Sequence, residues 1–130
     1  MGAPQPPLQP LRIPPGWRIE WNTWFEIDPT TGNVRAGYFG GSSLFMATHE
    51  ARRLYLDLEW RPEDDPAGEF VLTVHYTPWL RTESGRRRKN APVDRSTARL
   101  VFEFRTRDRS MAVREVEAAL VGRAEWQEPN

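Results

Sequence analysis

Apolar and polar residues alternate along much of this chain, which is the pattern of β-strands that bury one face. The alternation is longest over residues 54–60 and 69–77. An acidic stretch bounded by prolines separates these two runs, and its composition is typical of a turn. The sequence therefore predicts a β-hairpin, whose core-facing residues are Leu54, Leu56, Leu58, Trp60, Phe70, Leu72, Val74 and Tyr76.

The same period predicts further strands over residues 17–27, 34–39, 44–48 and 98–106. In the first of them, Trp24 shares a face with polar and charged neighbours, so its side chain is predicted to point away from the core. Along the last strand, the residues predicted to face the core are Leu100, Phe102 and Phe104.

Near the C-terminus the apolar period changes to that of a helix. The helix is predicted over about 110–121, with Asp108 or Ser110 as its N-terminal cap and Gly122 at its end. Its apolar stripe consists of Val113, Val116, Ala119 and Leu120. Together these elements predict an α+β domain, with a mostly antiparallel sheet of five to seven strands and one C-terminal helix packed on it.

The chain is predicted to hold a single domain, because 130 residues support one hydrophobic core. Residues 1–12 are rich in proline and are predicted to form a flexible, extended leader. The domain is predicted over 13–125, followed by a tail at 126–130. No apolar run has the length of a membrane span, and the N-terminus lacks the apolar stretch of a secretory signal. The absence of cysteine excludes disulfides and thiolate chemistry and fits a cytoplasmic protein.

The net charge is zero, but the charges are distributed unevenly. Residues 50–70 carry seven acids against three arginines, whereas residues 80–110 carry ten bases against four acids. Such a dipolar surface steers a charged protein partner more readily than it holds a long nucleic acid. The charge pattern therefore favours protein binding.

The residue types that carry chemistry do not form a recognisable site. The two histidines, His49 and His75, lack the spacing of a zinc motif, and no metal or cofactor is predicted. Asp57 and Glu59 are about 7 Å apart on one strand face, but any acidic exposed face gives that spacing. The Gly-Gly-Ser-Ser stretch at 40–43 lacks the context of a phosphate loop or a serine nucleophile. No catalytic residue is predicted, and the chain is not expected to be an enzyme.

Two surfaces are instead candidates for binding a partner. The first combines the acidic turn and the acidic strand face with tryptophans, which often anchor interfaces. The alternative is a nucleic-acid contact through a basic loop inside the irregular region 80–97. The residues of the first surface are Trp24, Asp57, Glu59, Glu63, Asp64, Asp65 and Trp79, and those of the basic loop are Arg86, Arg87, Arg88 and Lys89.

Four segments in order resemble a known family: residues 13–17, 22–29, 56–70, and 104–109 before a helix rich in Val and Glu. Together they look like the small bacterial immunity proteins that are encoded beside secreted polymorphic toxins. The resemblance implies a cytoplasmic protein that inhibits a cognate toxin by stoichiometric binding. The proline-rich leader and the long basic insertion at 80–97 depart from the family pattern, and they leave the toxin class open.

Overall fold

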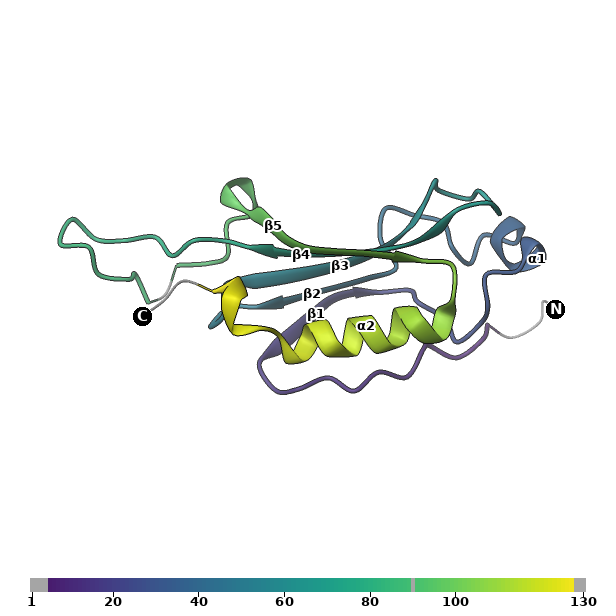
Figure 1. The fold of residues 1–130 in the computed structure, drawn as a ribbon, viewed down its shortest axis with the longest axis horizontal. Coiled ribbons are helices and arrows are strands. Elements are labelled where there is room, and N and C mark those ends of the chain that lie inside the picture. The colour runs from purple at the N-terminus through teal and green to yellow at the C-terminus, as the bar shows by residue number, and fades with distance from the viewer. Residues whose placement is uncertain (1–4, 90, 128–130) are drawn as a thin grey trace.

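The computed structural model describes residues 5–89 and 91–127. Its five strands form one antiparallel sheet in the order β1-β2-β3-β4-β5, and the helix α2 packs on one face of it (Figure 1). The predicted α+β class is confirmed, with five strands. The elements are β1 (Trp17–Asn22), α1 (Thr31–Arg35), β2 (Phe45–His49), β3 (Leu54–Arg61), β4 (Glu69–Tyr76), the 3₁₀ turn η1 (Arg95–Thr97), β5 (Arg99–Thr106), α2 (Arg109–Val121) and the 3₁₀ turn η2 (Ala124–Trp126).

The predicted hairpin is the centre of the sheet, formed by β3 and β4. Every second residue of β3 is buried, and its buried positions pair with buried positions of β4, as in the pair Leu58 and Leu72. Trp60 ends this row, and its indole N–H donates to the backbone oxygen of Asp65 at 2.8 Å. The buried tryptophan thus holds the turn that follows it.

The helix α2 begins and ends near the predicted residues. The Asp108 side chain accepts a hydrogen bond from the backbone N–H of Met111, and Gly122 ends the helix with φ of 87°. Val113 of the predicted stripe is only partly buried against the core. The buried residues of α2 are Ala112, Val116, Ala119 and Leu120.

The first strand is shorter than predicted, and the predicted position of Trp24 is wrong. β1 has a register shift between Ile19 and Trp21 and ends at Asn22, whose side chain accepts from the backbone N–H of Trp24. The chain bends there, so the two-residue alternation does not continue. Trp24 enters the core, with 1% of its surface exposed, and contacts the ring of Phe70. Trp21 is 52% exposed instead.

Two other strand predictions change in the structure. The segment predicted as a strand over 34–39 includes the end of the short helix α1, which Thr30 caps by accepting from the N–H of Asn33. In β5, Leu100 was predicted to face the core but is exposed, because the pairing with β4 shifts register between Val74 and His75. At the N-terminal end of β5, the predicted alternation between core and solvent is therefore no longer followed.

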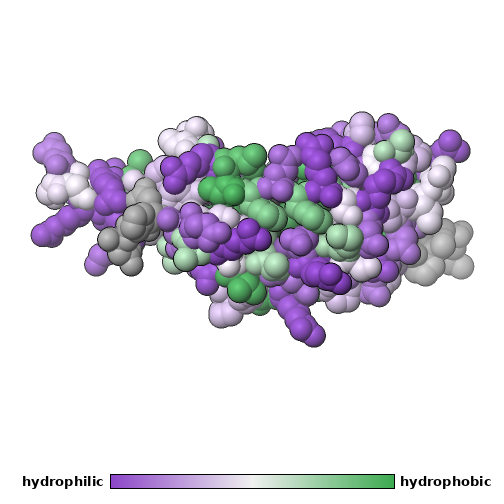
Figure 2. All heavy atoms as spheres, viewed as in Figure 1, coloured by the Kyte–Doolittle hydropathy of each residue, from purple (hydrophilic) through white to green (hydrophobic). Residues whose placement is uncertain are grey.

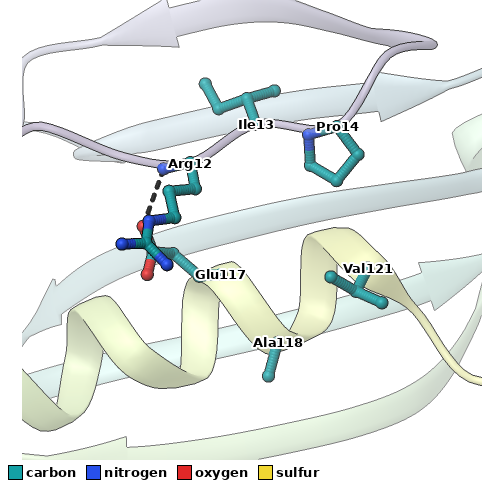
Figure 3. A pocket seen from close by; sticks show the side chains of 6 residues that line it. All are labelled: Arg12, Ile13, Pro14, Glu117, Ala118 and Val121. Carbon is teal, nitrogen blue, oxygen red and sulfur yellow. Dashed lines mark hydrogen bonds between the residues drawn. The ribbon is translucent and has the colours of Figure 1, made fainter.

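The N-terminal segment is extended and hydrogen-bonded from Pro7 onward. The backbone oxygen of Pro7 accepts from Glu26, and the N–H of Gln9 donates to Trp24. Further along, the backbone N–H of Arg12 donates to the carboxylate of Glu117 at 2.7 Å, beside a shallow pocket between this segment and α2 (Figure 3). The predicted start of the domain at residue 13 therefore lies later than the first residues that pair with it. Residues 1–4, which belong to the predicted leader, lie outside the described residues.

The predicted tail also begins too early. Trp126, in η2, is buried, and its ring lies 5.5 Å from that of Phe102. It extends the core beyond the helix, so the domain continues at least to this residue. Residues 128–130 lie outside the described residues.

Candidate partner-binding surface

The structure places the acidic turn and the basic region at opposite ends of the molecule. The turn, residues 62–68, joins β3 to β4 at one end of the sheet. The basic arm, residues 79–89 and 91–92, follows β4 and projects from the other end (Figure 1). The charge segregation seen along the sequence is thus a separation in space.

The face of the sheet opposite α2, called the open face below, has no α-helix packed on it in the described part of the chain, and the 3₁₀ turn η1 meets it through Arg95. One row crosses it from strand to strand, because each residue pairs with the next across the sheet. Exposed Trp21 lies at one end of this row, and its indole N–H donates to the backbone oxygen of Ser43 at 3.0 Å. The row consists of Trp21, Met46, Asp57, Thr73 and Glu103.

Asp57 occupies the middle of this row on the central strand. Burial raises the pKa of its carboxyl to about 6, while a hydrogen bond from Ser43 acts in the opposite direction and the nearby charge of Glu59 raises it further. One carboxylate oxygen is buried and has no hydrogen-bond partner among the described residues. A carboxylate that is partly desolvated and incompletely hydrogen-bonded gains more from a new basic partner than a solvated one does.

Asp57 and Glu59 lie on the same open face, as the alternation predicts. Unlike Asp57, Glu59 forms an ion pair, in which Arg61 donates to its carboxylate at 3.0 Å. Glu103 is likewise paired with Arg105 at 2.7 Å. Among the described residues, Asp57 is therefore the carboxylate of this row without an ion pair.

A second cluster occupies the open face toward the basic arm. The rings of Tyr55 and His75 stack at 4.7 Å, and the guanidinium of Arg95 from η1 lies over the tyrosine ring. Arg95 also pairs with Glu20 of β1. Burial lowers the pKa of His75, so the neutral ring is favoured in this stack.

The two histidines lie on opposite faces of the sheet. His75 belongs to the open face, whereas His49 is buried on the other side, where its ring meets Trp17 edge-on at 5.3 Å. The Nδ1 atom of His49 accepts from the backbone N–H of Arg52. Within the described ranges, no group of three or more His, Asp or Glu side chains is arranged to hold a metal ion.

The carboxylates of the acidic turn have local structural partners. Glu63 accepts from the backbone N–H of Gly41 at 2.8 Å, and Asp65 accepts from that of Ala67 at 2.9 Å. Asp64 has a left-handed backbone with φ of 58°, and its carboxylate approaches Gly40 so closely that a Cβ there would lie 2.7 Å from Oδ1. These acids shape the turn as well as charging it.

The basic arm is a hairpin with a fixed root. Arg81 and Arg87 form an antiparallel bridge within it, and the backbone N–H of Arg88 donates to the oxygen of Leu80. At the root, Trp79 lies under the guanidinium groups of both Arg53 and Arg87, at 4.7 and 5.3 Å. Trp79 is therefore half-buried among arginines and is not a free aromatic anchor.

Sequence reasoning missed Trp21, Met46 and Arg95 on the open face. The exposure of Trp21 depends on the register shift in β1, and Arg95 reaches the face from η1, which is distant in sequence from β3. The alternation around Met46 does place it on the polar side of its strand, which was an available signal.

Comparison with known proteins adds no relative. No family model, curated protein or solved structure shows significant similarity to the chain. In the portion of the chain that is described, none of the helices has the length and apolar character needed to cross a bilayer.

Proposed function

We propose that this chain is a non-enzymatic binding protein that neutralises a bacterial toxin by stoichiometric binding in the cytoplasm of the producing cell. The observation that carries the proposal is Asp57, a partly buried carboxylate that has no ion pair among the described residues and lies at the centre of a sheet face on which no described α-helix packs. A basic side chain of a partner would pair with the accessible part of this carboxylate, and it would reach the buried oxygen only if neighbouring side chains move. The resemblance to immunity proteins supplies the partner class.

Trp21 is the proposed aromatic anchor of this interface. It is exposed, its indole is held by Ser43, and it lies two strands from Asp57 in one row of the sheet. Across two strand spacings of about 5 Å, both side chains fit under one partner footprint. Tryptophans in such positions often dominate binding energy. Trp24 is no longer part of the proposed surface, because it lies in the core.

The acidic turn is proposed as the rim of the same interface. The turn comes directly after the C-terminal end of β3, close to Glu59. Its three carboxylates, Glu63, Asp64 and Asp65, therefore add negative charge beside the open face. Rim charges speed association more than they hold a complex together. The residues of the open face are therefore expected to determine the affinity for the toxin, and those of the turn the rate of association.

The test is co-expression with the toxin domain encoded beside this gene. The chain is expected to restore growth of cells that produce the toxin, and to bind the purified toxin domain in calorimetry. Trp21→Ala and Asp57→Lys should each weaken binding by at least about tenfold. Met111→Ala, which changes an exposed apolar residue on α2, is the control and should leave binding unchanged. A neighbouring gene without a toxin, or unchanged affinity in both open-face variants, would contradict the proposal.

The second candidate is nucleic-acid binding by the basic arm. The observation in its favour is that the arm projects beyond the end of the sheet and that Arg53 fixes its root (Figure 1). Fluorescence anisotropy with labelled single-stranded RNA and duplex DNA tests it. Binding that falls with salt and is lost when residues 86–89 are changed to alanine would favour this candidate.

A further inference from the structure

In the described part of the chain, the outer edge of β5 is unpaired. β5 is the last strand of the sheet, and no described segment hydrogen-bonds to the side that faces away from β4. Edge strands expose backbone N–H and C=O groups that template pairing with another chain, and proteins usually block them. β5 has eight residues, which is long enough to pair.

The surface along this edge is apolar in its middle. Leu100 is 51% exposed, and Val101, Phe102 and Phe104 are only partly buried against the core. Figure 2 shows apolar surface gathered over β5, bordered by polar surface on both sides. This composition, with an apolar centre and a polar rim, is typical of an interface.

The two halves of β5 differ in accessibility. Near its start, the register shift beside Leu100 distorts the strand, and η2 covers Phe102, with the Arg123 guanidinium 5.0 Å from that ring. No such cover is seen over Phe104 among the described residues. A partner strand is therefore best accommodated over the second half of β5.

The charges of this half are complementary to a second copy of themselves. If two β5 strands pair antiparallel about a twofold axis at Phe104, Glu103 faces Arg105 of the second copy, and the reverse pair forms by symmetry. With the axis at Phe102, Arg99 of one copy would face Arg105 of the other. With the axis at Glu103 or at Arg105, that residue would face its own copy, which has the same charge. An axis at Val101 also pairs opposite charges, but it lies at the distorted, covered end.

We infer that the chain forms a symmetric dimer by antiparallel pairing of β5 with β5 of a second copy, with Phe104 at the twofold axis. The sheet then continues through both copies, and the unpaired backbone groups of the edge find partners. Because the copies join edge to edge, both open faces stay uncovered. Trp21 on β1 and Asp57 on β3 lie away from this edge, so the dimer is compatible with the proposed toxin binding, and Glu103 borders both surfaces.

The register can be read by cross-linking, since the chain has no cysteine. Glu103→Cys and Arg105→Cys chains, mixed under mild oxidation, are expected to form a disulfide between copies, because directly opposed residues lie within disulfide reach. Each variant alone should cross-link much more slowly, since its cysteines are offset by two residue positions from direct opposition. Equal yields in all three samples would overturn the inference.

Sedimentation equilibrium of the unmodified protein supplies the second test. A concentration-dependent dimer is expected, and Glu103→Arg or Arg105→Glu should each weaken it by about tenfold through like-charge contacts. The double variant E103R/R105E should restore it, whereas Arg114→Glu on α2 should have no effect. A monomer at all concentrations, or a double variant as weak as the single ones, would overturn the dimer in this register. Circular dichroism of each variant verifies that the fold is retained.

Discussion

The buried guanidinium of Arg53 lies 4.7 Å from the ring centroid of Trp79, at the point where the basic arm leaves the sheet. The same guanidinium donates to the backbone oxygens of Ala91 and Pro92 at 2.7 and 2.9 Å. One side chain therefore holds the outgoing and the returning limb of the arm. Its own backbone oxygen accepts from the N–H of Thr77, and its φ is 58°.

Replacing Arg53 is expected to destabilise the basic arm more than the rest of the domain. Arg53→Ala removes two hydrogen bonds to otherwise unpaired oxygens and should lower the free energy of unfolding by about 2–3 kcal/mol. In hydrogen exchange, the arm should lose protection more than the β3–β4 hairpin does. Arg52→Ala, whose guanidinium donates to the oxygen of Val121, is the control, and the arm should remain protected in it. Equal loss across the whole sheet would contradict the role of Arg53 as an arm clamp.

Truncation of two neighbouring tryptophans should destabilise the protein to very different extents. Trp24→Ala removes a side chain from the core and should cost about 3–5 kcal/mol in unfolding free energy. Trp21→Ala removes an exposed ring and should cost about 1 kcal/mol or less. Urea denaturation of both variants measures the difference. Similar costs would mean that the chain does not bend after Asn22 as described.

Asp57 should make stability depend on pH between about 4 and 6. Its pKa is raised from 3.8 to about 6 in the fold, so over this window the unfolded chain loses the proton while the folded chain keeps it. The contribution of Asp57 to the free energy of unfolding therefore falls as pH rises through this window and levels off above it. Asp57→Asn should remove this pH dependence. At pH 7 the variant should be more stable than the unmodified protein by about 1 kcal/mol, because it no longer holds a partly buried charge.

The measurement is the urea midpoint of both proteins at several pH values across this window. Glu83→Gln, which neutralises an exposed carboxylate on the basic arm, serves as the control for the change in net charge. It should keep the pH dependence of the unmodified protein. Parallel profiles for Asp57→Asn and the unmodified protein would show that Asp57 is not the group responsible.

The N-terminal cap of α2 should contribute measurably to stability. Asp108→Ala removes the hydrogen bond to the N–H of Met111 and should lower the thermal midpoint of unfolding. The Asp108 pKa is lowered chiefly by that hydrogen bond, so the contribution is present above its unfolded pKa and disappears as pH falls through its folded pKa. Ser110→Ala, which lacks the capping role, should cost less. Equal thermal shifts for the two variants would contradict this assignment.

The β3–β4 hairpin and α2 were predictable because their signals are local. A strict two-residue alternation over β3 admits one orientation toward a core, and a capping aspartate with a later glycine marks both ends of α2. The joint position of Asp57 and Glu59 on one face follows from the same alternation. Other segments gave misleading local signals. The alternation around Trp24 is as regular as that around Leu56, yet it crosses a bend.

Local patterns were sufficient to predict the fold class, the central hairpin, the C-terminal helix and the separation of charge along the chain. The burial of Trp24 and the exposure of Trp21 became evident only in the folded chain, as did, among the described residues, the missing ion pair of Asp57 and the free edge of β5. The reason is that periodicity records which residues alternate within one segment. Bulges, bends and strand order depend instead on contacts between distant segments, and those contacts decide which side of the alternation meets the core.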